Sequence, residues 1–188
     1  MKLVLLRHGA TAANEAHVYC GAADPGLSAE GKTALINRQK TCRYPEICGM
    51  HVITSGMKRC EETLAVLYGD VPHETDCAFR EMDFGVFEMR SYEELKTDPL
   101  YLDWITGDNE TNIAPGGESG EIMTQRVHAA LERLLREDRD VLLVTHGGVI
   151  AAIMSDLFPA EKKNRYEWQP APGGGYAADL CDMRYVRF

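Results

Sequence analysis

Two histidines follow short apolar segments at opposite ends of the chain. His8 comes after the run 3–6 and Arg7, and His146 comes directly after the run 141–145. Apolar runs of this length that end at glycine turns are typical of buried strands in a parallel sheet. The carboxyl ends of parallel strands meet at one edge of the sheet, which is where open α/β sheets bind ligands. The two histidines are therefore predicted to lie together at that edge.

Two further charged residues are predicted near the same edge. Arg59 follows the apolar segment 51–54 after a glycine turn, and Glu81 stands in a loop with apolar neighbours. Phosphoryl transfer from an ester needs a nucleophile, donors for three phosphate oxygens and a proton for the leaving alcohol. The imidazole of His8 suits the nucleophile. Glu81 suits the acid that protonates the leaving oxygen and then activates water.

The other candidates are donors to a bound phosphate. Arginine presents a planar fork of N–H groups, and a helix start presents free backbone amides. The predicted donors are Arg7, Asn14, Arg59, His146 and the amide of Gly147. This chemistry requires no metal ion and no cofactor.

Each of these residues also has a structural interpretation. A lone histidine at a strand end is more often a hydrogen-bonded structural residue, Arg59 fits a solvated helix charge, and Glu81 fits a simple loop carboxylate. Ser55 and Glu118 fit a role in the site and a structural role equally well. The ordered set favours catalysis more strongly than any single member does.

The composition limits the class of protein. A chain of 188 residues has room for one well-buried domain, and a net charge of −9 argues against nucleic acid or an anionic membrane as partner. The six cysteines form no C-x-x-C pair, and Cys42, Cys48 and His51 are too irregularly spaced to favour a zinc site. Unpaired thiols, with neither a signal peptide nor a membrane span, predict a cytoplasmic protein.

Strand and helix signals alternate along the chain. This pattern predicts a three-layer α/β/α fold with a mostly parallel central sheet. Strands are expected at 3–6, 51–54 and 141–145, with an ambiguous segment at 71–79 and a closing strand in 176–188. Helices are expected at 29–43 (capped by Ser28), 57–68, 118–137 and 148–157. We expect a single domain, 1–188, in which 90–117 forms a short cap-like insertion over the carboxyl edge of the strands.

In chain order, these residues and their neighbours resemble the histidine phosphatase (phosphoglycerate mutase-like) superfamily, in its branch of small phosphatases. The resemblance is carried by 7–9 with Thr11 and Asn14, then 21–24, 27–31, Ser55 with Arg59 and Thr63, 81–88, 117–119 and 145–148. It implies a phosphomonoesterase that forms a phosphohistidine on His8, uses Glu81 as proton donor and acts on a small soluble phosphorylated metabolite. Within this branch, the loop around Glu81 and residues 104–119 are similar to those of α-ribazole phosphatases.

The sequence departs from the family pattern at several positions. Ala10 stands where an acidic residue is common, Cys60 replaces a common alanine, and Phe87 and Met89 stand where tryptophan and glycine are usual. None of these changes removes a predicted catalytic group. Ala10 and Met89 are compatible with an unusual natural ester. The aromatic candidates for contact with its alcohol half, which fit core packing equally well, are Tyr19, Phe87, Tyr92, Trp104 and Tyr176.

Two other functions remain open. A phosphoglycerate mutase of this superfamily would need a longer enclosing insertion than 90–117 provides. A non-catalytic phospholigand sensor would be expected to have lost His8 or Glu81, and both are present. The sequence gives no indication of the oligomeric state.

Overall fold

The computed structural model describes residues 1–41, 44–108 and 110–188. Within these ranges six strands form one sheet in the order β3-β2-β4-β1-β5-β6, with β5 and β6 antiparallel to their neighbours and the other pairings parallel. The strands are β1 (Lys2–Arg7), β2 (His51–Thr54), β3 (Glu74–Thr75), β4 (Val141–Thr145), β5 (Gly175–Asp179) and β6 (Arg184–Arg187). The predicted mostly parallel sheet is confirmed.

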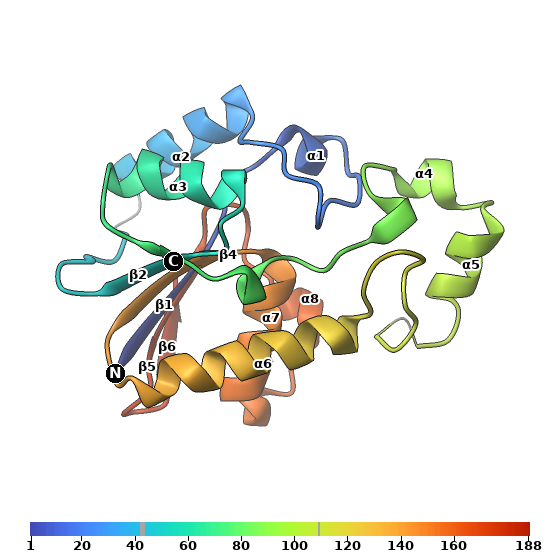
Figure 1. Cartoon of the computed structure of the whole chain (residues 1–188). Coiled ribbons are helices and arrows are strands. Elements are labelled where there is room, and N and C mark those ends of the chain that lie inside the picture. Colours follow the sequence, from blue (N-terminus) through green and yellow to red (C-terminus); the bar gives the residue numbers. More distant parts are fainter. Residues whose placement is uncertain (42–43, 109) are drawn as a thin grey trace.

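Helices cover both faces of the sheet (Figure 1), as the predicted three-layer fold requires. The α-helices are α1 (Ala12–Glu15), α2 (Ala29–Thr41), α3 (Lys58–Tyr68), α4 (Tyr92–Leu95), α5 (Pro99–Ile105), α6 (Gly120–Arg136), α7 (Gly147–Leu157) and α8 (Arg165–Trp168). Short 3₁₀ turns lie at η1 (Cys77–Phe79), η2 (Gly85–Phe87) and η3 (Pro159–Glu161). Among the described residues, no helix combines the length and the hydropathy needed to cross a membrane.

Alternating side chains of β1 build the two halves of the core. Leu3 and Leu5 pack with the buried faces of α6 and α7, while Val4 and Leu6 pack with those of α2 and α3. This period of two follows from the pleat of a strand, which sends successive side chains to opposite faces. Burial of both faces explains why β1 and β4 read as continuous apolar runs.

The register of the central strands aligns their carboxyl ends. Arg7 of β1 lies opposite Thr145 of β4, and Thr54 of β2 lies opposite Val144. The residues that follow each strand therefore leave the sheet at the same edge. The predicted juxtaposition of the two histidine turns is confirmed by this pairing.

The expected helices are present with small shifts at their ends. Ser28 Oγ accepts a hydrogen bond from the Gly31 amide, as expected of the cap of α2. The last two residues of the expected helix 29–43 lie outside the described residues. Ser119 caps α6, so the helix begins at Gly120 instead of residue 118.

The ambiguous segment 71–79 holds a short strand, and the expectation of one closing strand needs correction. The segment 71–79 contributes only the two residues of β3 before η1 begins. The tail expected to form one closing strand folds into two, β5 and β6, because a turn at 180–183 reverses the chain.

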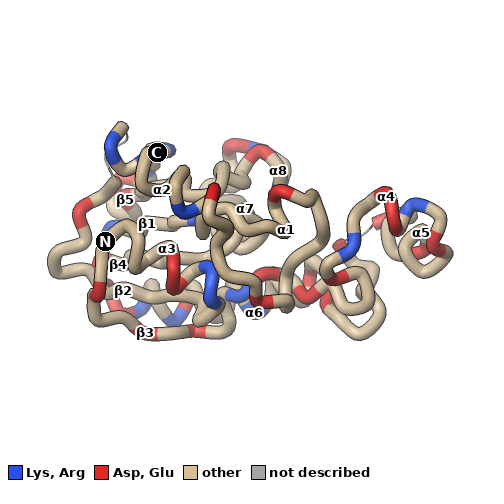
Figure 2. The backbone as a smooth tube through the Cα atoms, turned by 90° about the horizontal axis from the view of Figure 1, so that it is seen from above, with Lys and Arg blue, Asp and Glu red and all other residues tan. Residues whose placement is uncertain are grey.

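Residues 90–117 contain α4 and α5, which lie beyond the carboxyl ends of the strands, away from the sheet (Figures 1 and 2). Aromatic side chains link this segment to the rest of the molecule. Tyr19 and Tyr101 share a hydrogen bond of 2.7 Å between their hydroxyls, and Tyr19 also packs against Phe84 and Trp104. The aromatic cluster holds 90–117 next to the loop that follows β1.

Candidate active site

His8 directly follows β1 and is almost completely buried. Its Nδ1 donates a 2.7 Å hydrogen bond to the Gly9 carbonyl oxygen, which leaves the lone pair on Nε2. Burial, aided by the nearby Arg59 charge, lowers the pKa of His8 to about 3. The ring is therefore neutral at physiological pH and carries the lone pair that a nucleophile needs.

His146 follows β4 and lies edge-on to His8, with 5.1 Å between ring centroids. Its Nδ1 accepts a 3.2 Å hydrogen bond from Arg59 Nε, and its Nε2 lies 2.9 Å from Ser55 Oγ. Because Arg59 Nε always carries a hydrogen, Nδ1 is the acceptor and the proton of the neutral ring is on Nε2. Burial holds the pKa of His146 well below its usual value. The ring is fixed from both sides.

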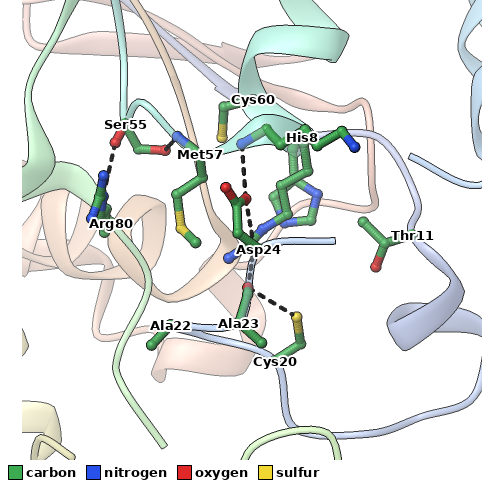
Figure 3. Close-up of polar contacts among 12 residues, drawn as sticks. His8, Thr11, Cys20, Ala22, Ala23, Asp24, Ser55, Met57, Cys60 and Arg80 are labelled. Atoms are coloured by element: carbon green, nitrogen blue, oxygen red, sulfur yellow. Dashed lines mark hydrogen bonds and ion pairs between the residues drawn. The ribbon is translucent and has the colours of Figure 1, made fainter. Parts of the chain in front are cut away.

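Arg59 comes from the first turn of α3 and is buried, with 1% of its surface exposed. Its Nη1 and Nη2 donate 2.8 Å hydrogen bonds to the carbonyls of Ala23 and Gly21. Figure 3 shows Ala23 and Asp24 of this loop in one close-up with His8, and the Arg59 charge acts on the His8 ring. The guanidinium is therefore held in one orientation next to the imidazole.

Arg7 completes the group of four residues that we call the cradle, namely Arg7, His8, Arg59 and His146. Arg7 Nη1 donates a 2.7 Å hydrogen bond to the Pro170 carbonyl, while Arg7 Nε is buried with no hydrogen-bond partner. A buried donor without a partner is costly and points to a group that is bound there in function. A Cβ built on Gly147 would lie 3.1 Å from Arg7 Cζ, so this glycine lets the guanidinium approach α7 closely.

Glu81 lies in the loop between η1 and η2, and its side chain contacts the first turn of α7. Its Oε2 accepts a 2.9 Å hydrogen bond from the Gly148 amide, and its Oε1 accepts one of 3.1 Å from the Met82 amide. A Cβ built on Gly148 would lie 2.4 Å from Glu81 Oε1. In the first turn of α7, Gly147 therefore lies close to Arg7, and its neighbour Gly148 lies close to the Glu81 carboxylate.

The sequence matches the model of the histidine phosphatase superfamily (branch 1) over residues 3–178. This match covers nearly the whole chain. The chain belongs to the histidine phosphatase superfamily.

Similar proteins include both phosphatases and mutases. The adenosylcobalamin/α-ribazole phosphatase of Salmonella typhimurium is 29% identical over 97% of this chain and 92% of its own length. A probable phosphoglycerate mutase of Salmonella choleraesuis is 31% identical over 84% of this chain and 74% of its own. A solved structure titled as a putative α-ribazole-5'-P phosphatase from Escherichia coli superposes with a TM-score of 0.85 at 27% identity, over 100% of this chain and 94% of that one.

Three other predicted site residues of this histidine phosphatase have identified contacts. Asn14 Oδ1 accepts a 3.0 Å hydrogen bond from the amide of Thr11, the N-cap of α1, and so completes the capping box of this helix. This contact leaves the role of Asn14 as a phosphate donor a prediction. Ser55 contacts His146 and so supports the cradle from outside. Glu118 forms an ion pair with Arg126 at 2.8 Å. The Gly147 amide lies at the first residue of α7.

The aromatic candidates differ in position. Tyr19 is half-buried in the cluster beneath the 90–117 segment, and Trp104 is buried there. Phe87 is fully buried, and Tyr176 is buried on β5 against Trp168, so these two serve the core. Tyr92 on α4 is 55% exposed.

Sequence reasoning missed several residues that hold the cradle. Glu88 is the clearest: its carboxylate accepts hydrogen bonds of 2.9–3.2 Å from the amides of residues 21–23, and one of 3.0 Å from the Phe84 amide. The same loop supplies the carbonyls that bind Arg59. A carboxylate within the family pattern was the available signal, but its partners are too distant in sequence to be inferred.

In the described part of the chain, no group of three or more His, Cys, Asp or Glu residues is arranged so that it could hold a metal ion. Of the residues weighed for zinc, Cys42 lies outside the described residues. Cys48 is exposed, and His51 contacts Glu74 and Arg139.

Proposed function

We propose that this histidine phosphatase hydrolyses a small phosphorylated metabolite through a phosphohistidine on His8, with Glu81 as proton donor. The observation that carries the proposal is the orientation of His8. Its Nδ1 is committed to the Gly9 carbonyl, so the Nε2 lone pair is available for attack beside the buried Arg59 and the partly buried Arg7. A neutral imidazole in this setting is suited to in-line attack on phosphorus.

The surrounding donors suit the charge that develops on the phosphoryl oxygens. Arg7 offers an unpartnered buried Nε, and the Gly147 amide lies at a helix start, where the dipole favours an anion. Hydrogen bonds to two loop carbonyls fix the orientation of the Arg59 guanidinium. We assign Arg7, Arg59 and the Gly147 amide to the phosphate, together with Asn14. His146 is assigned to the site as the residue that holds Arg59, because Arg59 and Ser55 engage both of its ring nitrogens. A donor fixed before reaction contributes about 3–4 kcal/mol to transition-state stabilisation.

Glu81 is assigned to the proton that the leaving alcohol requires. The Glu81 carboxylate accepts a hydrogen bond from the amide of Gly148, the residue after Gly147. It therefore lies at the same helix start as the proposed phosphate position. After the alcohol departs, the same carboxylate would take a proton from the water that attacks the phosphohistidine. No metal ion or cofactor takes part in this sequence.

The alcohol half is proposed to contact the aromatic cluster of Tyr19 and Trp104, with 90–117 as a cap over the entrance. Relatives named α-ribazole phosphatase match this chain over nearly its full length, and they support an α-ribazole phosphate ester as the specific substrate. We also propose a cytoplasmic location, because the described cysteines are free. The net charge of −9 favours neither nucleic acid nor an anionic membrane as partner.

The test is phosphate release from a panel of phosphomonoesters in the presence of chelator, with the His8→Gln protein as blank. The panel contains α-ribazole phosphate, 3-phosphoglycerate, sugar phosphates and nucleotides. Fast, His8-dependent release from one ester would support the proposal and identify the substrate class. Conversion of phosphoglycerate to its isomer without release would support a mutase instead. Binding of esters with no turnover would support a sensor.

A further inference from the structure

Arg126, in the middle of α6, lies outside the cradle but contacts the backbone of Glu81 and of the residues before it, and its ion-pair partner Glu118 contacts the backbone after Glu81. We propose that Arg126, together with Glu118, is the positioning residue of the acid loop, which we define as residues 80–88. This inference rests on the proposed role of Glu81 as the proton donor. Arg126 acts through the backbone and does not itself touch the reacting atoms.

Three backbone carbonyls converge on one guanidinium. Arg126 Nη1 donates hydrogen bonds of 2.8 and 2.7 Å to the carbonyls of Ala78 and Arg80, and Nη2 donates one of 3.0 Å to the carbonyl of Glu81. One arginine side chain therefore holds the backbone of the proposed acid and of the residues just before it. Charge-assisted hydrogen bonds of this kind are about twice as strong as neutral ones.

Glu118 extends the contact to the other side of Glu81. Its carboxylate pairs with Arg126 in a bidentate manner, with distances of 2.9 Å to Nε and 2.8 Å to Nη2. Its Oε2 also accepts a 3.1 Å hydrogen bond from the Asp83 amide. Although burial alone would raise the pKa of Glu118, the hydrogen bonds from Arg126 and the Asp83 amide hold it below its usual value. Glu118 and Arg126 are therefore both charged at neutral pH.

The acid loop needs such a support because a strand does not carry Glu81. The residue lies between two short 3₁₀ turns, η1 and η2, and its carboxylate is anchored at the Gly148 amide. Arg126 and Glu118 fix the backbone on the α6 side, while Gly148 fixes the side chain on the α7 side. A shift of the loop by about 1 Å is enough to cost a large factor in rate. The pair is accordingly expected to act on the proton-donating step more than on phosphate binding.

The experiment separates these steps by the leaving group. Single-turnover release of the alcohol reports phosphorylation of His8 and is independent of later hydrolysis. It is measured for p-nitrophenyl phosphate, which leaves without a proton, and for the alkyl ester identified in the panel. The variants are Glu81→Gln as reference, Arg126→Met and Glu118→Gln. Arg133→Met is the matched control, because Arg133 lies on the same helix in a surface ion pair with Asp76.

We expect Glu81→Gln to slow the alkyl ester by about 10²-fold or more and the aryl ester by only a few-fold. Arg126→Met and Glu118→Gln should show the same selectivity, with alkyl losses on the order of 10–100-fold. Arg133→Met should match the wild type on both esters. Melting temperatures are recorded throughout. Should Arg126→Met not fold, Glu118→Gln decides the question, because it keeps the shape of the side chain.

The outcomes distinguish the two levels of the argument. Equal losses on both esters in Arg126→Met and Glu118→Gln, beside a selective loss in Glu81→Gln, would overturn the positioning role while leaving Glu81 as the acid. Unchanged rates in both would overturn it too. Equal losses on both esters in Glu81→Gln would overturn the proposed acid itself. In that case a selective loss in the Arg126 and Glu118 variants would point to a different donor on the same loop.

Discussion

The cradle and the acid loop are built in different ways. Three of the four cradle residues adjoin the ends of paired strands: Arg7 ends β1, His8 follows it, and His146 follows β4. The acid loop lies between two 3₁₀ turns, and long-range side chains hold it. Backbone pairing fixes the first region, whereas charged contacts fix the second. The cradle is expected to tolerate surface changes that would displace the acid loop.

The largest expected effect comes from removing the nucleophile. His8→Gln should reduce turnover by on the order of 10⁴-fold or more for every ester, because attack on phosphorus is lost whatever the leaving group. The measurement is steady-state phosphate release, with circular dichroism to show that the fold persists. Substantial residual turnover in a folded protein would exclude the covalent mechanism.

Adjacent glycines on α7 allow each region to be perturbed separately. Gly148→Ala places a Cβ 2.4 Å from Glu81 Oε1, and Gly147→Ala places one 3.1 Å from Arg7 Cζ. We expect Gly148→Ala to slow alkyl esters by roughly 10–100-fold with little effect on aryl esters. Gly147→Ala should slow both classes alike.

Stability provides the control for the two glycine variants. Alanine favours a helix over glycine by about 1 kcal/mol, so neither variant should lower the free energy of unfolding substantially. Urea unfolding checks this expectation. If both variants showed the same dependence on the leaving group, the proposed division between cradle and acid loop would be wrong.

A smaller effect is expected where the two regions meet. Glu88 belongs to the acid loop, yet its carboxylate binds the loop that holds Arg59. Glu88→Gln replaces one acceptor oxygen by an NH₂ group that faces backbone N–H donors, so Arg59 should lose alignment. We expect about a tenfold loss in kcat/KM for aryl and alkyl esters equally. A loss confined to alkyl esters would assign Glu88 to the acid instead.

The last prediction concerns stability below neutral pH. His8 has a pKa of about 3 in the fold and about 6.5 when unfolded, so between these values only the unfolded state takes up the proton. The free energy of unfolding should therefore fall as the pH is lowered from 6.5, by about 1.4 kcal/mol per pH unit for such a group.

Urea unfolding from pH 5 to 7.5 measures this slope. His8→Gln should remove the share that belongs to His8 and retain that of His146. His128→Gln, which removes a histidine whose side chain is 40% exposed, is the matched control. An unaltered slope in His8→Gln would contradict the lowered pKa of His8 in the fold.

The same contrast explains what the sequence could predict. The apolar runs before His8 and His146 show strands directly, and parallel strands align their ends, so most of the cradle could be placed without a structure. The two antiparallel strands of the tail could not be separated, because alternation does not reveal where a hairpin turns. The contacts of Arg126 and Glu88 could not be predicted, because their hydrogen-bond partners lie far away in sequence.

The central claim is that phosphate passes through His8. Glu81→Gln mixed with p-nitrophenyl phosphate and quenched rapidly in alkali should preserve any phosphoenzyme, because loss of the base slows its hydrolysis. We predict one phosphate on the peptide containing His8, stable in alkali and lost in acid. Release of a full equivalent of p-nitrophenol with no phosphohistidine, or with the phosphate on another residue such as Cys20, would contradict the account.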